Sequence, residues 1–381
     1  MYKKLISLVL VIIMFAGISI NAFAIDSNQV LTESKNSVDL DSIYDVVYSS
    51  EWSDMVRPDR IEACQIPNEI LDKLSTTELI QAVLDFPFFI DIYAFDTISE
   101  GYSCVFSECK ALQTLVRRND KTEKIIEYYS SMDVPQNIKN TSENKKFDDL
   151  WKMELLISQD DFCYEMSDEQ KVEILNIAES KQLAKSQNLE IYSGSNNAFF
   201  ESASENSALS LYSVSSTVYT PKGSAVSVYK WTSNDSDFSS TEISSLNSQY
   251  AKAYPNATRL ANPTKKYNCH SYAWYSQTTS NIYWMNNPSK YMTDGSYNKV
   301  TKMNTSVGDR MVYFTSTNGT NSGINHSAII VSYTNHSKSR RTFVVKSKWG
   351  QLGLYRHSWD DGPYMYWNGS KSPSDLAYYH R

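Results

Sequence analysis

Apolar side chains recur at helical spacing from about residue 40 to 190. Residues 75–78 (Ser-Thr-Thr-Glu) predict a capping box, in which the serine oxygen accepts an orphan amide and the glutamate reaches back, just before an apolar run. Pro87 should end or kink that helix. Further helices are expected at 103–118, 122–132, 148–158 and 168–186. Because this region contains no histidine, metal-ligand spacing or phosphate loop, we interpret it as a packing or targeting domain without chemistry.

The pattern changes at residues 190–216, which are rich in Ser and Asn and lack periodicity, as is typical of a linker. Beyond it, alternating residues predict a pair of strands that turn around residues 221–224 (Pro-Lys-Gly-Ser). Residues 239–242 (Ser-Ser-Thr-Glu) predict a capped helix that runs to about Tyr254. All five histidines, at 270, 326, 336, 357 and 380, fall in this C-terminal part.

The first 24 residues have the pattern of a secretory signal peptide. Lys3 and Lys4 precede an apolar run at 5–20, and an A-x-A site ends at Ala24. We therefore expect a signal peptide at 1–24, a helical domain of unknown role at 25–189, a linker at 190–216 and a second domain at 217–381. The mature protein should be extracellular, with no membrane span after cleavage.

Charge is divided unevenly along the chain. Residues 251–381 carry 16 Lys and Arg against 5 Asp and Glu, whereas the first 250 residues carry 20 against 38. A positive field of this kind could attract an anionic cell-wall polymer, or the lysines could simply be solvated without a partner. No RNA- or DNA-binding motif accompanies the charge, so nucleic acid is not an expected partner.

The cysteines divide into a group of four and a single residue. Cys64, Cys104, Cys109 and Cys163 allow up to two disulfides in three pairings, and reduced buried thiols are an equal alternative. Cys269 has no partner in this scheme, so its role has to be sought elsewhere.

Cys269 follows a residue that is favoured at helix starts. Asn268 is a good N-cap, and the sequence CHSYAWYS after it is compatible with a helix. A thiol in the first helical turn lies near the positive end of the helix dipole, which lowers its pKa, and its backbone N–H could stabilise an oxyanion. A buried structural cysteine is the alternative interpretation.

A thiolate nucleophile needs a base, and His326 is the best candidate. It begins an apolar strand, HSAIIVSY, after the expected loop at 315–325, and the sequence VGDRMVYF at 307–314 predicts the neighbouring strand. This places His326 at the mouth of a strand, where loops commonly build sites.

Ser347 is the candidate third residue. If the segment 334–341 turns the chain and Tyr333 pairs with about Arg341, His326 lies opposite Ser347 or Lys348. Alternation along 342–350 points Lys348 outward and Ser347 inward, where its hydroxyl could fix the imidazole tautomer. Otherwise Ser347 is a small residue that fills space beside a core histidine.

Three segments resemble NlpC-like cell-wall cysteine peptidases in the same chain order. NCHSYAWY resembles their DCSGFVxYV helix, GDRMVYF their GDLVFF strand, and NHSAIIV their GHVGIYI strand; VKSKWG is similar to the IKNSWG segment of the wider papain-like superfamily. The resemblance covers roughly residues 255–360. It implies an α+β, papain-like C-terminal domain in which a helix bearing nucleophile Cys269 packs on an antiparallel sheet bearing base His326.

The sequence departs from this pattern at the third residue. Ser347 stands where the relatives carry Asn, His or Gln, so His357 or His336 could substitute for it. Tyr267 and Tyr254 are candidates for completing the oxyanion hole. His270 should point away from Cys269, toward the surface or behind the site. A zinc site from Cys269, His270 and His326 would lack a fourth ligand, so no metal or cofactor is expected.

Two functions follow. The first is a secreted hydrolase that cleaves amide bonds, with peptidoglycan peptides suggested by the resemblance. The second is a catalytically inactive papain-like module that binds wall polymer or a protein partner through tryptophans such as Trp284, Trp359 and Trp367, although core or interface packing is the favoured role of these three.

Overall fold

The structure is a computed structural model of the chain, and it describes residues 43–192, 214–233, 235–317, 320–364 and 376–381. The expected signal peptide, most of the expected linker and Trp367 lie outside these residues. The described residues belong to one compact unit that spans 38–381. Helix α11 (Leu189–Tyr192) and strand β1 (Val214–Tyr219) occupy the two ends of the expected linker. The domain boundaries stay predictions.

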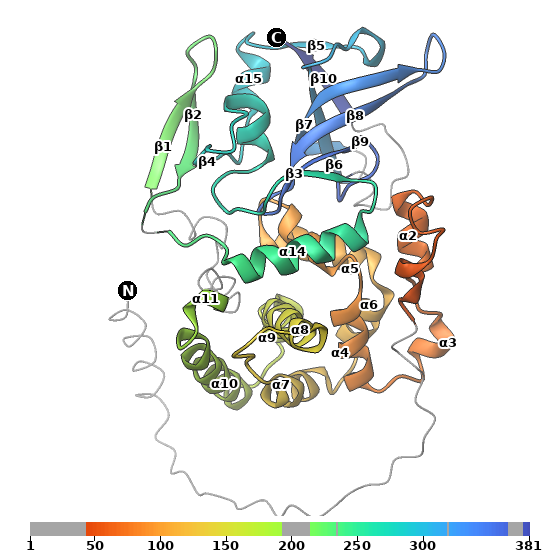
Figure 1. Cartoon of the computed structure of the whole chain (residues 1–381), viewed down its shortest axis with the longest axis vertical. Coiled ribbons are helices and arrows are strands. Elements are labelled where there is room, and N and C mark those ends of the chain that lie inside the picture. Colours follow the sequence, from red (N-terminus) through yellow and green to blue (C-terminus); the bar gives the residue numbers. More distant parts are fainter. Residues whose placement is uncertain (1–42, 193–213, 234, 318–319, 365–375) are drawn as a thin grey trace, which may run out of the picture. The chain divides into compact units, whose positions relative to one another are not determined.

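The N-terminal part is helical, as expected (Figure 1). Its main helices begin at capped residues, because side-chain oxygens of Ser75, Thr97, Asn140 and Ser167 accept the amide three residues later. The elements are η2 (Asp45–Tyr48), α2 (Arg57–Ala63), α3 (Asn68–Leu71), α4 (Thr76–Asp85), η3 (Phe89–Ala94), α5 (Ile98–Glu108), α6 (Lys110–Val116), α7 (Lys121–Ser131), α8 (Thr141–Ile157), α9 (Asp160–Cys163), α10 (Asp168–Ser186) and α11.

The single helix expected at 103–118 is wrong. The chain forms α5 and α6 instead, separated by Cys109, whose φ of −115° and ψ of 100° are extended. A capping box at Thr97 and Glu100 starts α5 earlier than the apolar pattern suggested. All five cysteines are free thiols, so none of the possible disulfide pairings occurs here.

The C-terminal part combines helices with antiparallel sheets, which confirms the α+β class. One sheet has the order β1-β2-β4 and the other β3-β9-β8-β7-β6-β10-β5. The further elements are β2 (Ala225–Lys230), α14 (Ser240–Ala253), β3 (Thr258–Ala261), η4 (Ser271–Tyr275), β4 (Tyr283–Trp284), α15 (Ser289–Thr293), β5 (Asn298–Val300), η5 (Lys302–Asn304), β6 (Arg310–Thr317), β7 (Thr320–Asn335), β8 (Arg341–Lys348), β9 (Leu354–Ser358) and β10 (Leu376–His380).

The predicted strand pair around residues 221–224 and the capped helix α14 are both confirmed. The loop expected at 315–325 is wrong, because β6 and β7 extend into it and pair directly. His326 lies inside β7 opposite Tyr313, and a register shift follows at once, since Phe314 pairs with Ile324. A bulge of this kind redirects side chains locally.

The expected register between β7 and β8 is also wrong. Tyr333 pairs with Phe343 rather than Arg341, because the strands extend further into the hairpin, and a second bulge between Ile330 and Ser332 shifts the pairing by one residue. Consequently Ile329 lies opposite Lys346.

The helical and C-terminal parts share one apolar core, which includes Leu79, Leu156, Tyr250 and Trp349. A buried charged cluster joins them as well. The Arg57 guanidinium binds Asp91 and Glu108, and the hydroxyl of Tyr254 donates to Asp91. Within the described ranges, no helix is both long and apolar enough to cross a membrane.

Candidate active site

Cys269 lies where the sequence places it, in the first turn of a short helix. The carbonyl oxygen of the Asn268 side chain accepts the N–H of Ser271 at 3.1 Å, which confirms Asn268 as the cap. The same oxygen accepts the N–H of Met285, and the side-chain amide donates to the Met285 carbonyl at 2.7 Å. Asn268 is therefore fully bonded and holds Cys269 on a fixed backbone. From Ser271 onward the turn widens into the π-helix η4.

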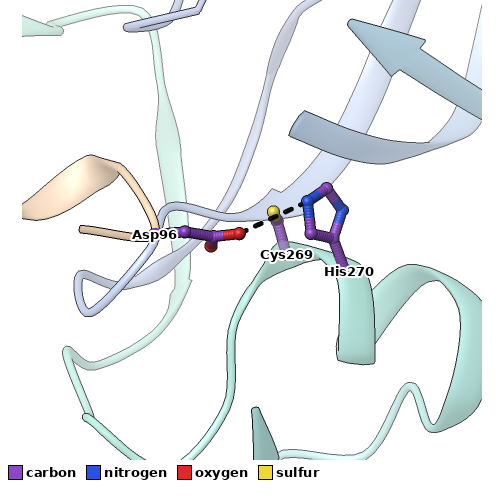
Figure 2. Close-up of side chains that lie close together, drawn as sticks. All are labelled: Asp96, Cys269 and His270. Atoms are coloured by element: carbon purple, nitrogen blue, oxygen red, sulfur yellow. Dashed lines mark ion pairs between the residues drawn. The ribbon is translucent and has the colours of Figure 1, made fainter. Parts of the chain in front are cut away.

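The side chains of Asp96 and His270 lie close to the sulfur of Cys269 (Figure 2). One ligand-type atom each from Asp96, Cys269 and His270 lies within 4.8 Å of the others. His270 Nε2 is 3.5 Å from Asp96 Oδ2, and Asp96 Oδ1 accepts the Asn268 amide at 3.0 Å. Asp96 follows η3, so the helical part contributes directly to this cluster.

Of the two positions expected for His270, the surface is wrong, because its side chain is completely buried; the ring lies in the cluster beside the Cys269 sulfur. Its Nδ1 hydrogen bonds with the hydroxyl of Ser327 at 2.8 Å, and the indole of Trp274 donates to the same hydroxyl. Ser327 on β7 thus fixes the ring so that Nε2 faces Asp96 and Cys269 (Figure 2). Burial lowers the pKa of His270 to about 3, so the ring is neutral.

The thiol of Cys269 is protonated in this setting. Burial raises its pKa well above the ordinary value, and nearby Asp96 raises it further, whereas the backbone N–H groups of Ser327 and His270 and the ammonium of Lys348 act in the opposite direction. The lowered pKa expected from the helix start is wrong, because loss of solvent outweighs the dipole.

His326 is fully buried, and its ring stacks on Tyr364 with centroids 3.6 Å apart. Among the described residues, neither ring nitrogen has a hydrogen-bond partner. Burial lowers the pKa of His326 well below its usual value, and His270 and His357 add to this shift, so the imidazole is neutral with a free lone pair. The next residue, Ser327, supplies the backbone donor that favours the Cys269 thiolate.

Ser347 contacts a different histidine from the expected one. Its hydroxyl hydrogen bonds with His357 Nε2 at 2.9 Å and accepts the indole N–H of Trp349 at 3.1 Å. His357 Nδ1 bonds to the Ser358 carbonyl, and burial lowers the pKa of His357 to about 4. The other alternative, His336, is exposed in the β7–β8 turn and bonds to Thr342.

Lys348 was expected to face solvent but is fully buried. Its ammonium donates to the carbonyls of Thr264 and Gly350 and lies 5.1 Å from the centre of the Tyr267 ring. Burial lowers its pKa to about 7. Of the two oxyanion candidates, Tyr254 is bound within the Arg57 and Asp91 cluster.

The one group among the described residues that could hold a metal ion is Asp96, Cys269 and His270. It offers three ligands, whereas a closed structural zinc site has four. His326, which the sequence-based zinc alternative used, does not belong to it.

Trp284 and Trp359 are buried, which confirms their interpretation as packing residues. Comparisons with protein-family models, with curated proteins and with solved structures found no match to this chain. The interpretation of the site therefore depends on its own geometry.

Sequence reasoning missed Asp96 and Tyr364, and it named His270 and Lys348 without assigning either to the catalytic site. The position of His270 directly beside the lone cysteine was itself a signal. Asp96 lies in a region chosen as free of chemistry, 173 positions before Cys269 in the sequence, and nothing in its local sequence indicates the contact.

Proposed function

We propose that this protein is a secreted cysteine hydrolase with a papain-like C-terminal domain that cleaves amide bonds, with peptidoglycan peptides as its substrate class. The observation that carries the proposal is the position of Cys269. Its thiol lies in a capped helix start, beside the β7 strand, which also bears His326, a neutral imidazole with no hydrogen-bond partner in the part of the chain that the structure describes. The peptidoglycan assignment rests on the sequence resemblance and on the excess of basic residues after position 250.

In the proposed mechanism the Cys269 thiol and the His326 imidazole are both uncharged at the start. His326 removes the proton from the Cys269 thiol as the sulfur attacks the scissile carbonyl carbon. Backbone N–H groups at the helix start stabilise the negative oxygen of the tetrahedral intermediate. His326 then gives the proton to the leaving amine as the C–N bond breaks, and water hydrolyses the thioester to release the acid and restore the thiol. Ser347 makes no hydrogen bond with the His326 ring and instead orients His357.

Burial of Cys269 and His326 favours the second function, a catalytically inactive module that binds a partner or a wall polymer. In that case the thiol would be a packing residue, and the neutral forms of all the groups around it would simply reflect an apolar interior.

Hydrolysis of purified peptidoglycan by the full chain distinguishes the hydrolase from the inactive binding module. In a form of the chain whose Cys269 can be reached by iodoacetamide, new amino groups should appear. Adding Cys163→Ser, which removes a partly exposed thiol, should leave that release unchanged, whereas adding Cys269→Ser should lower it about a thousandfold or more. Release that survives Cys269→Ser would contradict the proposal. So would a total lack of release from a variant in which Cys269 reacts freely with iodoacetamide.

A further inference from the structure

The candidate site is covered by a segment of the same chain. Residues 93–96 comprise the end of η3 and the first two residues after it, and they lie against the loop after β8 and the start of the Cys269 helix. We call residues 93–96 the plug segment. Cys269 and His326 keep 1% and 0% of their exposed area, respectively, so no substrate could reach them in this arrangement.

Each plug residue contacts a group of the C-terminal part. The Tyr93 carbonyl accepts the backbone N–H of Gln351 at 2.9 Å. The Ala94 carbonyl accepts the hydroxyl of Tyr364, the residue whose ring stacks on His326. The Phe95 ring meets the same Tyr364 edge to face, with centroids 5.3 Å apart. The C-terminal part therefore binds backbone carbonyls of the plug segment, as a binding cleft binds the backbone of a peptide.

Asp96 reaches the reacting centre itself. Its Oδ1 accepts a hydrogen bond from the Asn268 amide at 3.0 Å, and its Oδ2 lies 3.5 Å from Nε2 of the neutral His270 ring. When it is ionised, Asp96 also opposes formation of the Cys269 thiolate through its negative charge. The contact therefore blocks access to the sulfur, and loss of the Asp96 proton would add to the protection of the thiol.

The fit at Gly350 is too close for any side chain. A Cβ atom at this position would lie 2.4 Å from the Tyr93 carbonyl oxygen and 2.6 Å from the carbonyl carbon and oxygen of Ala94. The backbone also needs the left-handed conformation there, with φ of 49°. Gly350 lets the plug segment approach the loop directly.

We propose that the plug segment is a built-in inhibitory peptide, and that the fold described here is the latent form of the hydrolase. This inference rests on the proposed function, and it names the site's ligand class as a peptide bound through its backbone, with a carboxyl group beside the thiol. Cys269 becomes reactive when residues 93–96 leave the site while the rest of the fold stays intact.

The test is the rate at which iodoacetamide alkylates each cysteine of the full, native chain, read by peptide mass. In the wild type, Cys269 should be as protected as Cys104, which is completely buried in the shared core. Gly350→Ala should increase alkylation of Cys269 at least about tenfold while Cys104 stays protected, because a local opening differs from global unfolding. Tyr364→Phe, which removes the bond to the Ala94 carbonyl and keeps the ring, should act in the same direction.

Gly223→Ala is the matched control. Gly223 also has a positive φ, of 84°, but a Cβ there would meet no atom within 4 Å, so the variant carries backbone strain without the clash. It should leave Cys269 protected. The plug proposal would be overturned by any of three results. These are equal exposure of Cys269 and Cys104 in Gly350→Ala, equal effects of both glycine variants, and rapid alkylation of Cys269 in the wild type. Free alkylation without hydrolysis in Gly350→Ala would instead contradict the proposed function and leave the plug standing.

Discussion

Asp96 offers the sharpest quantitative prediction, since it is a carboxyl group held beside a thiol and a neutral imidazole. Burial raises its pKa from 3.8 to about 8, an effect that the Asn268 hydrogen bond reduces. The folded chain therefore prefers the protonated acid, whereas the unfolded chain releases the proton above about pH 4. The stabilisation is complete below pH 4 and is lost as the pH rises toward 8.

The size of the effect follows from the shift. Each pKa unit is worth about 1.4 kcal/mol, so a shift of about four units sets an upper bound of about 6 kcal/mol. The Asp96 side chain keeps 17% of its exposed area, and solvent screening lowers the expected loss to about 2 to 4 kcal/mol. Asp96→Asn keeps an oxygen that accepts the Asn268 amide and cannot ionise.

The measurement is the free energy of unfolding in urea between pH 4 and 9 for both proteins. Wild type and Asp96→Asn should be similar at pH 4, and the variant should be more stable by about 2 to 4 kcal/mol at pH 8.5. Lys348, whose lowered pKa has the opposite effect on stability, is common to both and cancels in the comparison. A difference that stays constant across this pH range would refute the reasoning.

Three further predictions concern the packing around the site. Ser347→Ala should lower the free energy of unfolding in urea by about 1 to 3 kcal/mol, because it removes the hydroxyl that bonds to both His357 and Trp349 and leaves His357 Nε2 and the Trp349 indole only their mutual contact at 3.2 Å. Alkylation of Cys269 should stay at the wild-type rate, and faster alkylation would show that Ser347 acts on the Cys269 site. Arg57→Met should lower the free energy of unfolding by about 3 to 5 kcal/mol in the same urea assay, because Asp91 and Glu108 stay buried without their cation. A decrease below about 1 kcal/mol would contradict this. Gly101→Ala should lower the midpoint of thermal unfolding by several degrees, although a Gly-to-Ala change usually stabilises a helix by about 1 kcal/mol. The reason is that the new Cβ would lie 2.1 Å from the Ile92 carbonyl oxygen. An unchanged or higher midpoint would argue against that contact.

Local signals in the sequence were enough for much of the fold. The capping boxes at Ser75, Ser167 and Ser239 mark the starts of α4, α10 and α14, because the serine hydroxyl and the Glu or Gln three residues later satisfy each other's backbone amides with no help from tertiary structure. The cap at Asn268 was found for the same reason.

Long-range features were harder to predict. The register of β7 depends on two bulges, and one inserted residue reverses which side chains face the core. The protonated state of Cys269 was missed because a helix start favours the thiolate, whereas burial opposes it, and burial cannot be counted from the local sequence. Asp96 reaches the site only because η3 and α5 pack against the C-terminal part.

The most direct test of the central claim, that Cys269 is a nucleophile served by His326, is its alkylation rate at pH 6 in the Gly350→Ala variant, with and without His326→Ala. A thiol assisted by a neighbouring imidazole should react about tenfold or more faster than the partly exposed Cys163 of the same molecule, and His326→Ala should remove that advantage. Equal rates at Cys269 and Cys163, unchanged by His326→Ala, would contradict the account.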